Sequence, residues 1–169
     1  MVLAVSALTS CKEKKNTGDI IVTKIVKKAP VQTEAMSPWN FSKNVEWLAT
    51  VYKVTINRYS DKSLPLAKDE SGNKYFDNKI TLRILRKDGS TFIDKTFTKA
   101  DFGNYLSEDM KQNGALLGLM LNKAEGDNLI FTASVGSPDK LSDEYIPLTL
   151  KISRTGGVVI DKSRTEDAD

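Results

Sequence analysis

The 169-residue sequence contains no histidine and a single cysteine. These absences exclude Ser-His-Asp and Cys-His catalysis, CxxC redox chemistry, internal disulfides and zinc sites built from cysteine and histidine. No apolar run approaches the roughly 20 residues that a transmembrane helix needs. Neither a GxGxxG motif nor a P-loop occurs. From these absences we predict no cofactor and no metal ion.

What is present is the composition of an ordinary soluble domain, with 40% apolar and 28% charged residues. The length favours one domain with tails. The net charge of +3 belongs to a segment near the N-terminus, where six lysines stand between residues 12 and 28 against two acids. A nucleic-acid-binding protein carries its positive charge on a folded face, so we expect no nucleic-acid partner. A solvated linker, or weak attraction to anionic head groups, fits the basic segment.

The first eleven residues have the pattern of an export signal that ends at its processing site. A short apolar run is followed by Leu8-Thr9-Ser10-Cys11 and then by lysine-rich sequence. Leu8–Cys11 resembles the lipobox of bacterial lipoproteins. The resemblance implies that the Cys11 thiol receives a diacylglyceryl group and that Cys11 becomes the new N-terminus. Lipidation at Cys11 is therefore the predicted modification, and two or more acyl chains hold a protein stably on a membrane.

No basic residue precedes the apolar run, although a signal peptide normally begins with one, so we expect the signal to be truncated. The alternative is an apolar tail with an incidental free cysteine. Lys12 is not the aspartate that retains enteric lipoproteins in the inner membrane. By that analogy the predicted location is the cell envelope, with the outer membrane favoured and the periplasmic or surface face left open.

Period-two alternation of apolar and polar residues dominates the rest of the chain and predicts strands with one buried face. The pattern is clear over four stretches: 52–57, 80–84, 129–135 and 146–153. Asp88-Gly89 is typical of a tight hairpin turn, and further short turns follow at residues 125–128 and 155–157. Short turns between consecutive strands favour an antiparallel meander over βαβ units.

One segment, residues 98–113, has helical spacing instead. Thr98 with Asp101 resembles an N-cap arrangement, and Ser107 is placed to cap a second short helix. We therefore predict a mainly β fold: an antiparallel meander forming a small β-sandwich or a partly closed barrel, with a short helical insert. The predicted organisation is a signal peptide over 1–10, a lipidated cysteine and flexible linker over 11–42, a β-rich domain over 43–164 and an acidic tail over 165–169.

The polar connection from Ser60 to Asp77 is the best place to look for chemistry. Its polar side chains belong to Asp61, Asp69, Glu70, Ser71, Asn73, Tyr75 and Asp77. Asp69-x-Ser71-x-Asn73 begins like a calcium loop, but Lys74 and Ile80 replace the glycine and glutamate that such a loop requires. A solvated loop is the preferred interpretation, and no catalytic residue is assigned.

Several short strings of the body are similar to a family of uncharacterised lipoproteins from Bacteroides-type bacteria. These strings are Asp61–Pro65, Asp69–Asn78, Asp88–Ser90, Phe97–Lys99, Ser134–Gly136 and Tyr145–Leu148. The resemblance spans about Val45 to Ile160. The family is a domain of unknown function, so the resemblance implies a fold and an envelope location but no catalytic or ligand-binding residues.

Three hypotheses of function remain. The first is a lipid-anchored binding or interaction module, whose partner is an envelope protein or a small apolar molecule held between the sheets. The second is a carboxylate-based hydrolase of wall or glycan polymers, which needs two of Asp61, Asp69, Glu70, Asp77 and Asp94 to face each other about 5–10 Å apart. The third is a structural envelope lipoprotein, which predicts a broad exposed apolar patch. The lack of catalytic equipment favours the first.

Overall fold

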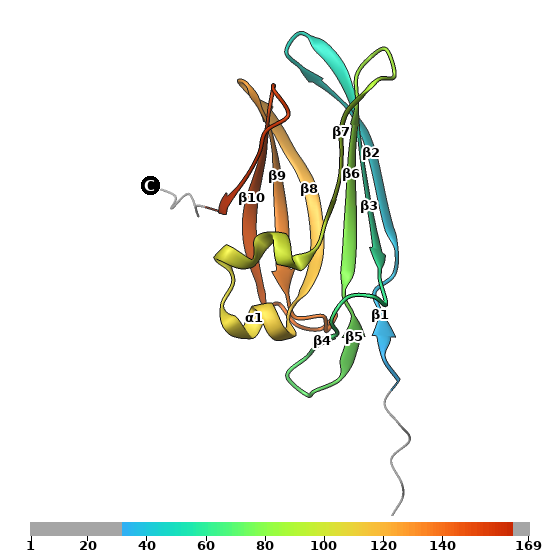
Figure 1. Cartoon of the computed structure of the whole chain (residues 1–169), viewed down its shortest axis with the longest axis vertical. Coiled ribbons are helices and arrows are strands. Elements are labelled where there is room, and N and C mark those ends of the chain that lie inside the picture. Colours follow the sequence, from blue (N-terminus) through green and yellow to red (C-terminus); the bar gives the residue numbers. More distant parts are fainter. Residues whose placement is uncertain (1–31, 164–169) are drawn as a thin grey trace, which may run out of the picture.

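The computed structural model describes residues 32–163, which form two packed β-sheets with a helical insert (Figure 1). One sheet has the strand order β2-β3-β6-β7 and the other has the order β11-β10-β9-β8. The strands of the first sheet are β2 (Trp39–Trp47), β3 (Thr50–Ser60), β6 (Asn78–Leu85) and β7 (Thr91–Phe97). Those of the second are β8 (Ala115–Glu125), β9 (Asn128–Gly136), β10 (Tyr145–Ser153) and β11 (Val158–Lys162).

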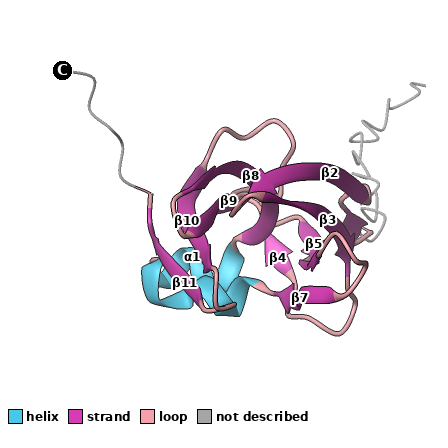
Figure 2. Cartoon of the chain, turned by 90° about the horizontal axis from the view of Figure 1, so that it is seen from above, coloured by secondary structure: helices cyan, strands magenta, loops and turns pink. Residues whose placement is uncertain are grey.

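Every neighbouring pair within these two sheets is antiparallel, and most pairs are hairpins of consecutive strands. The predicted meander is thus confirmed. Gly89 has φ +82° in the turn that joins β6 to β7, a conformation that glycine adopts without steric cost. The edge strands β2 and β8 come near each other in Figure 2 but are not hydrogen-bonded neighbours. Because the sheets stay separate, the fold is a β-sandwich and not a closed barrel.

Alternation along the strands builds the core between the sheets. Side chains at every second position of β3 and β6 point inward, and those of β9 and β10 meet them from the other sheet. Completely buried examples are Val54, Ile56, Leu82, Ile84, Phe131, Leu148 and Leu150. These side chains fill the space between the two layers.

A third, small sheet lies at the lower end of the sandwich in Figure 1, with the order β1-β5-β4. Its strands are β1 (Glu34–Ala35), β4 (Ala67–Lys68) and β5 (Lys74–Phe76). The predicted flexible linker over 11–42 therefore ends too late, because β1 and the start of β2 lie within it. The predicted solvated loop of residues 60–77 is also corrected, since it carries β4 and β5. Residues 1–31, with the lipobox and most of the linker, lie outside the described residues, as does the acidic tail.

The helical insert consists of the 3₁₀ helix η1 (Lys99–Tyr105) and the helix α1 (Glu108–Asn113), as predicted. The backbone N–H of Thr98 donates to Asp101 Oδ2 at 2.7 Å, and Ser107 Oγ accepts from the backbone N–H of Met110 at 3.2 Å. Phe102, Leu106 and Met110 pack into the core. Neither helix in residues 32–163 could span a bilayer, since they have seven and six residues.

Candidate functional site

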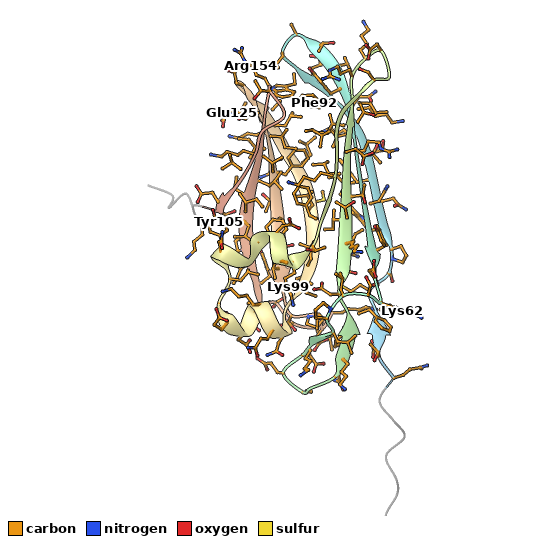
Figure 3. The ribbon with its side chains drawn as sticks, viewed as in Figure 1. Lys62, Phe92, Lys99, Tyr105, Glu125 and Arg154 are labelled. Carbon is orange, nitrogen blue, oxygen red and sulfur yellow. The ribbon has the colours of Figure 1, made fainter. Side chains whose placement is uncertain are left out.

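A buried pair of opposite charges, Asp77 and Lys99, lies where the helical insert meets the lower end of the sandwich. Lys99 is labelled there in Figure 3. Asp77 is 3% exposed and Lys99 is 9% exposed. Lys99 Nζ lies 3.6 Å from Asp77 Oδ2 and donates a hydrogen bond of 2.6 Å to the carbonyl oxygen of Gly114. Charged side chains are rarely this buried unless they are paired. The buried pair is thus an unusual polar feature of the described residues.

Three parts of the fold hold this pair in place: the β5–β6 connection, the start of β8 and the helix η1. Asp77 joins β5 to β6, and its Oδ1 accepts from the backbone N–H groups of Asn78 at 2.7 Å and Leu116 at 2.9 Å. Lys99 is the first residue of η1, directly after the Thr98 cap. Oδ1 is therefore occupied by structural hydrogen bonds, while Oδ2 faces Lys99.

Burial and hydrogen bonding act in opposite directions on the Asp77 carboxyl. Burial raises the pKa of Asp77 above its ordinary value of 3.8, and it is the largest influence. The backbone donors at Leu116 and Asn78 and the charge of Lys99 lower the pKa and oppose that rise. The carboxyl is consequently more easily protonated in the fold than in water.

The Asp77–Lys99 pair lies in the wall of a mainly apolar pocket of about 350 Å³, which we call the end pocket. Its lining residues are Leu64, Pro65, Asp77, Thr98, Lys99, Ala100, Gly103 and Lys111. An apolar pocket with a few convergent polar groups is the usual form of a small-molecule site. Gly103 of η1 is one of these lining residues, and a Cβ built on it would meet no heavy atom within 4 Å, so a side chain can be added there without a clash.

Sequence analysis singled out Asp77 but missed Lys99 and the apolar lining. The signal that existed was the Thr98–Asp101 cap, which places Lys99 in the first helical turn. The cap gives no reason to expect Lys99 to be buried, because the partners of Lys99, which are Asp77 and the carbonyl group of Gly114, come from other elements.

The remaining acids of the polar connection have separate roles. Asp61 pairs with Lys79 at 2.7 Å, and this contact holds the pKa of Asp61 well below its ordinary value. Asp69 accepts hydrogen bonds from Asn73 and Tyr75, which also lower its pKa. These contacts close the turn between β4 and β5, in which Ser71 is exposed. The acidic loop is therefore organised by its own side chains.

A second pocket, of about 260 Å³, is more polar than the end pocket, and we call it the polar pocket. Four carboxylates line it: Asp69, Glu70, Asp109 and Glu144. Among residues 32–163, no cluster of three or more acidic, cysteine or histidine side chains could hold a metal ion.

The five acids named for the hydrolase hypothesis are not brought to one site. Asp69 and Glu70 line the polar pocket, whereas Asp77 lines the end pocket. Asp94 pairs instead with Arg83 on the sheet surface, at 2.7 Å. Asp77 is the acid whose pKa is raised, and no second carboxylate is among the residues that line its pocket. Glycoside hydrolysis needs a raised-pKa acid opposite a second carboxylate.

Comparison with known proteins gives the chain a family but no activity. The predicted lipidation site, Cys11, lies outside the described residues, so the lipobox and a Bacteroides-type origin stay predictions. No curated protein matches the sequence. A family model described as "Domain of unknown function (DUF4738)" matches residues 20–160, which include the whole end pocket. The predicted membership of a domain of unknown function is thus confirmed, and the chain belongs to this family.

Proposed function

We propose that this protein is a lipid-anchored binding module of the cell envelope and that the end pocket is its ligand site. The anchor is Cys11, which follows the lipobox-like residues Leu8–Ser10. The single observation that carries the binding function is the buried Asp77–Lys99 pair in the wall of an apolar pocket. The outer membrane is the favoured location, by the analogy drawn from Lys12.

The ligand is small and mainly apolar. A volume of about 350 Å³ is near the lower limit for small-molecule sites, which take up on the order of 300–1,000 Å³. We place the ligand in the end pocket and not between the sheets, because side chains from both sheets fill the space between them. Lys99 Nζ and Asp77 Oδ2 provide the polar contacts that orient it.

The other two hypotheses have less support. A hydrolase would need a second carboxylate beside Asp77. A structural lipoprotein would gather exposed apolar side chains on one face. Of the large exposed apolar residues of the described chain, Met120, Tyr145 and Val159 share the outward face of the second sheet, each on a different strand. Leu48, Tyr59 and Leu141 come from other parts of the fold, so half of these residues are not on that face.

Two measurements test this function. Detergent-phase partitioning should place the full chain in the detergent phase and its Cys11→Ala variant in the aqueous phase. Recovery of both in the aqueous phase would contradict the anchor. Native mass spectrometry of the full chain should detect one bound apolar molecule, such as a monoacylglycerol.

The pocket assignment needs a matched pair of variants. Gly103→Leu adds a side chain on the pocket wall where there is space, whereas Asn104→Leu adds the same side chain at an exposed neighbouring position outside the pocket lining. We expect Gly103→Leu to abolish the adduct and Asn104→Leu to retain it. Equal retention by both variants would rule out the end pocket as the ligand site.

A further inference from the structure

The N-terminal segment joins the folded body directly beside the end pocket. β1 pairs in parallel with β5, with Glu34 opposite Tyr75 and Ala35 opposite Phe76. Phe76 is followed by Asp77, the acid in the pocket wall. β1, near the start of the described residues, therefore lies at the same end of the sandwich as β5 (Figure 1), and Asp77 of the pocket wall directly follows β5.

Side-chain hydrogen bonds fasten the next residues of the segment to this end. Asn78 Nδ2 donates to Met36 Sδ at 3.1 Å, and Ser60 Oγ donates to the Met36 carbonyl oxygen at 3.4 Å. Arg58 donates to the carbonyl oxygen of Ser37 at 3.0 Å and also to that of Leu117 in β8. The attachment point is thus fixed relative to the pocket, because Asn78 also donates to Asp77 Oδ1 through its backbone.

The chain between this attachment point and Cys11 is short. A stretch of the length of residues 12–33 spans at most about 80 Å even when fully extended. A lipid anchor at Cys11 therefore keeps the tethered end of the sandwich within about 80 Å of the bilayer. A molecule that leaves the membrane meets the end pocket at a much higher local concentration than it would in bulk solution.

The polar groups of the pocket define the head of the ligand. Lys99 Nζ is a donor and Asp77 Oδ2 is an acceptor, and together the two groups carry no net charge. An anionic head placed here meets the like charge of Asp77, and a cationic head meets the like charge of Lys99. Lys111, the other lysine of the lining, is paired with Glu108 at 2.6 Å. A head that both donates and accepts, such as a hydroxyl, fits both groups without a like-charge contact.

The apolar part of the pocket defines the rest of the ligand. Leu64, Pro65, Ala100 and Gly103 form an apolar wall, and Pro65 and Ala100 are exposed to solvent. An exposed apolar rim lets an acyl chain enter without crossing a polar barrier. The volume of about 350 Å³ suits one short chain and not a two-chain lipid.

On the basis of the proposed lipid anchor, we propose that the end pocket binds a single-chain amphiphile with an uncharged hydroxyl head, taken from the membrane to which the protein is anchored. The observation that carries this is the coincidence of the tether attachment, the apolar wall and the buried donor–acceptor pair at one end of the fold.

The test uses the full lipidated chain on phosphatidylcholine vesicles that contain one of three ten-carbon probes: 1-decanoylglycerol, decanoate or decyltrimethylammonium. Native mass spectrometry of the released protein measures the bound fraction. We expect a one-to-one adduct with decanoylglycerol and about tenfold weaker binding of each charged probe, because like-charge contacts are costly. Gly103→Leu should remove the adduct, and Asn104→Leu should leave it.

The source of the ligand is tested with the Cys11→Ala chain at the same protein and vesicle concentrations. We expect its occupancy by decanoylglycerol to be about tenfold lower, because the anchor no longer raises the local concentration. Equal occupancy with and without the anchor would overturn the membrane source, and equal binding of the charged probes would overturn the uncharged head. Absence of an adduct with every probe, on a chain shown to be lipidated, would contradict the proposed binding function itself.

Discussion

Aromatic side chains pack together at the upper end of the sandwich, whereas buried charges lie at the lower end. Figure 3 labels one residue of each end, Phe92 and Lys99. At the upper end, the rings of Trp47, Tyr52 and Phe92 pack with centroids 5.2–5.8 Å apart. Trp47 Nε1 also donates to the Gly126 carbonyl oxygen at 3.0 Å. These contacts connect three hairpins. The indole N–H, which is the polar group of Trp47, has a hydrogen-bond acceptor.

At the lower end, Asp77 and Lys99 are buried beside an open apolar pocket. Burying such a pair contributes little to stability, because desolvation offsets the attraction between the charges. The aromatic end therefore stabilises the fold, while the charged end is better explained by binding. Substitutions at the two ends should separate these two roles.

Trp47→Ala should have the largest effect on stability. It removes a buried indole, two ring contacts and a hydrogen bond at the upper end. We expect the free energy of unfolding, measured by urea denaturation, to fall by about 4 kcal/mol. The bound fraction of decanoylglycerol in the remaining folded protein should not change. Loss of binding in the folded fraction would contradict the separation of the two ends.

Lys99→Met should be the next largest change. It leaves the Asp77 carboxylate buried without its cation, which we expect to cost about 3 kcal/mol at pH 7. In the double variant with Asp77→Asn no charge is stranded, so about 1–2 kcal/mol should be regained. If the double variant is no more stable than Lys99→Met, the lysine contributes through packing and not through charge.

The destabilisation by Lys99→Met should also depend on pH. Burial raises the pKa of Asp77, and the charge of Lys99 opposes that rise, so removing Lys99 raises the pKa further. A carboxyl with a raised pKa takes up a proton more readily in the folded state. The contribution of Asp77 to stability is therefore highest below the unfolded pKa of 3.8 and is lost as the pH rises through the folded pKa. Urea denaturation should show that the free energy of unfolding of Lys99→Met is closer to that of wild type near pH 4 than at pH 7. A difference in free energy that does not depend on pH would contradict this account.

The smallest effect is expected at the turn between β4 and β5, beside the polar pocket. Burial, the hydrogen bond to Asp69 and the Asp69 charge raise the pKa of Tyr75 to about 12. Asp69→Asn removes the charge, so an ultraviolet titration should show this tyrosine ionising at a lower pH. The shift should be partial, because burial is the largest cause and persists. An unchanged titration would show that Tyr75 does not depend on Asp69.

Local features of the fold were predictable because their causes are local. Asp88-Gly89 specifies its turn through glycine at φ +82°, and Thr98 with Asp101 specifies the start of η1. The start of β2 was missed although Trp39, Phe41, Val45 and Trp47 alternate, because Lys43 interrupts the apolar series. β1, β4 and β5 have two or three residues each, too few for a period to be recognised.

The candidate site was less predictable because it depends on contacts between distant residues. Asp77 was one of several polar residues in a connection, and nothing in its neighbours distinguishes it from Asp61 or Asp69. Its burial follows from the backbone N–H of Leu116 and from Lys99, which reach it through the packing of β8 and η1. A lysine in the first turn of a helix is expected to be exposed, so sequence alone does not point to it.

The most direct test of the central claim is where an uncharged single-chain amphiphile binds. The backbone amide signals of the Cys11→Ala chain can be followed by nuclear magnetic resonance during a titration with 1-decanoylglycerol below its aggregation limit. We predict that the signals of Leu64, Lys99, Ala100 and Gly103 shift together and saturate, while those of Trp47 and Phe92 do not move. Saturable shifts at the aromatic end, or none at the end pocket, would contradict the account.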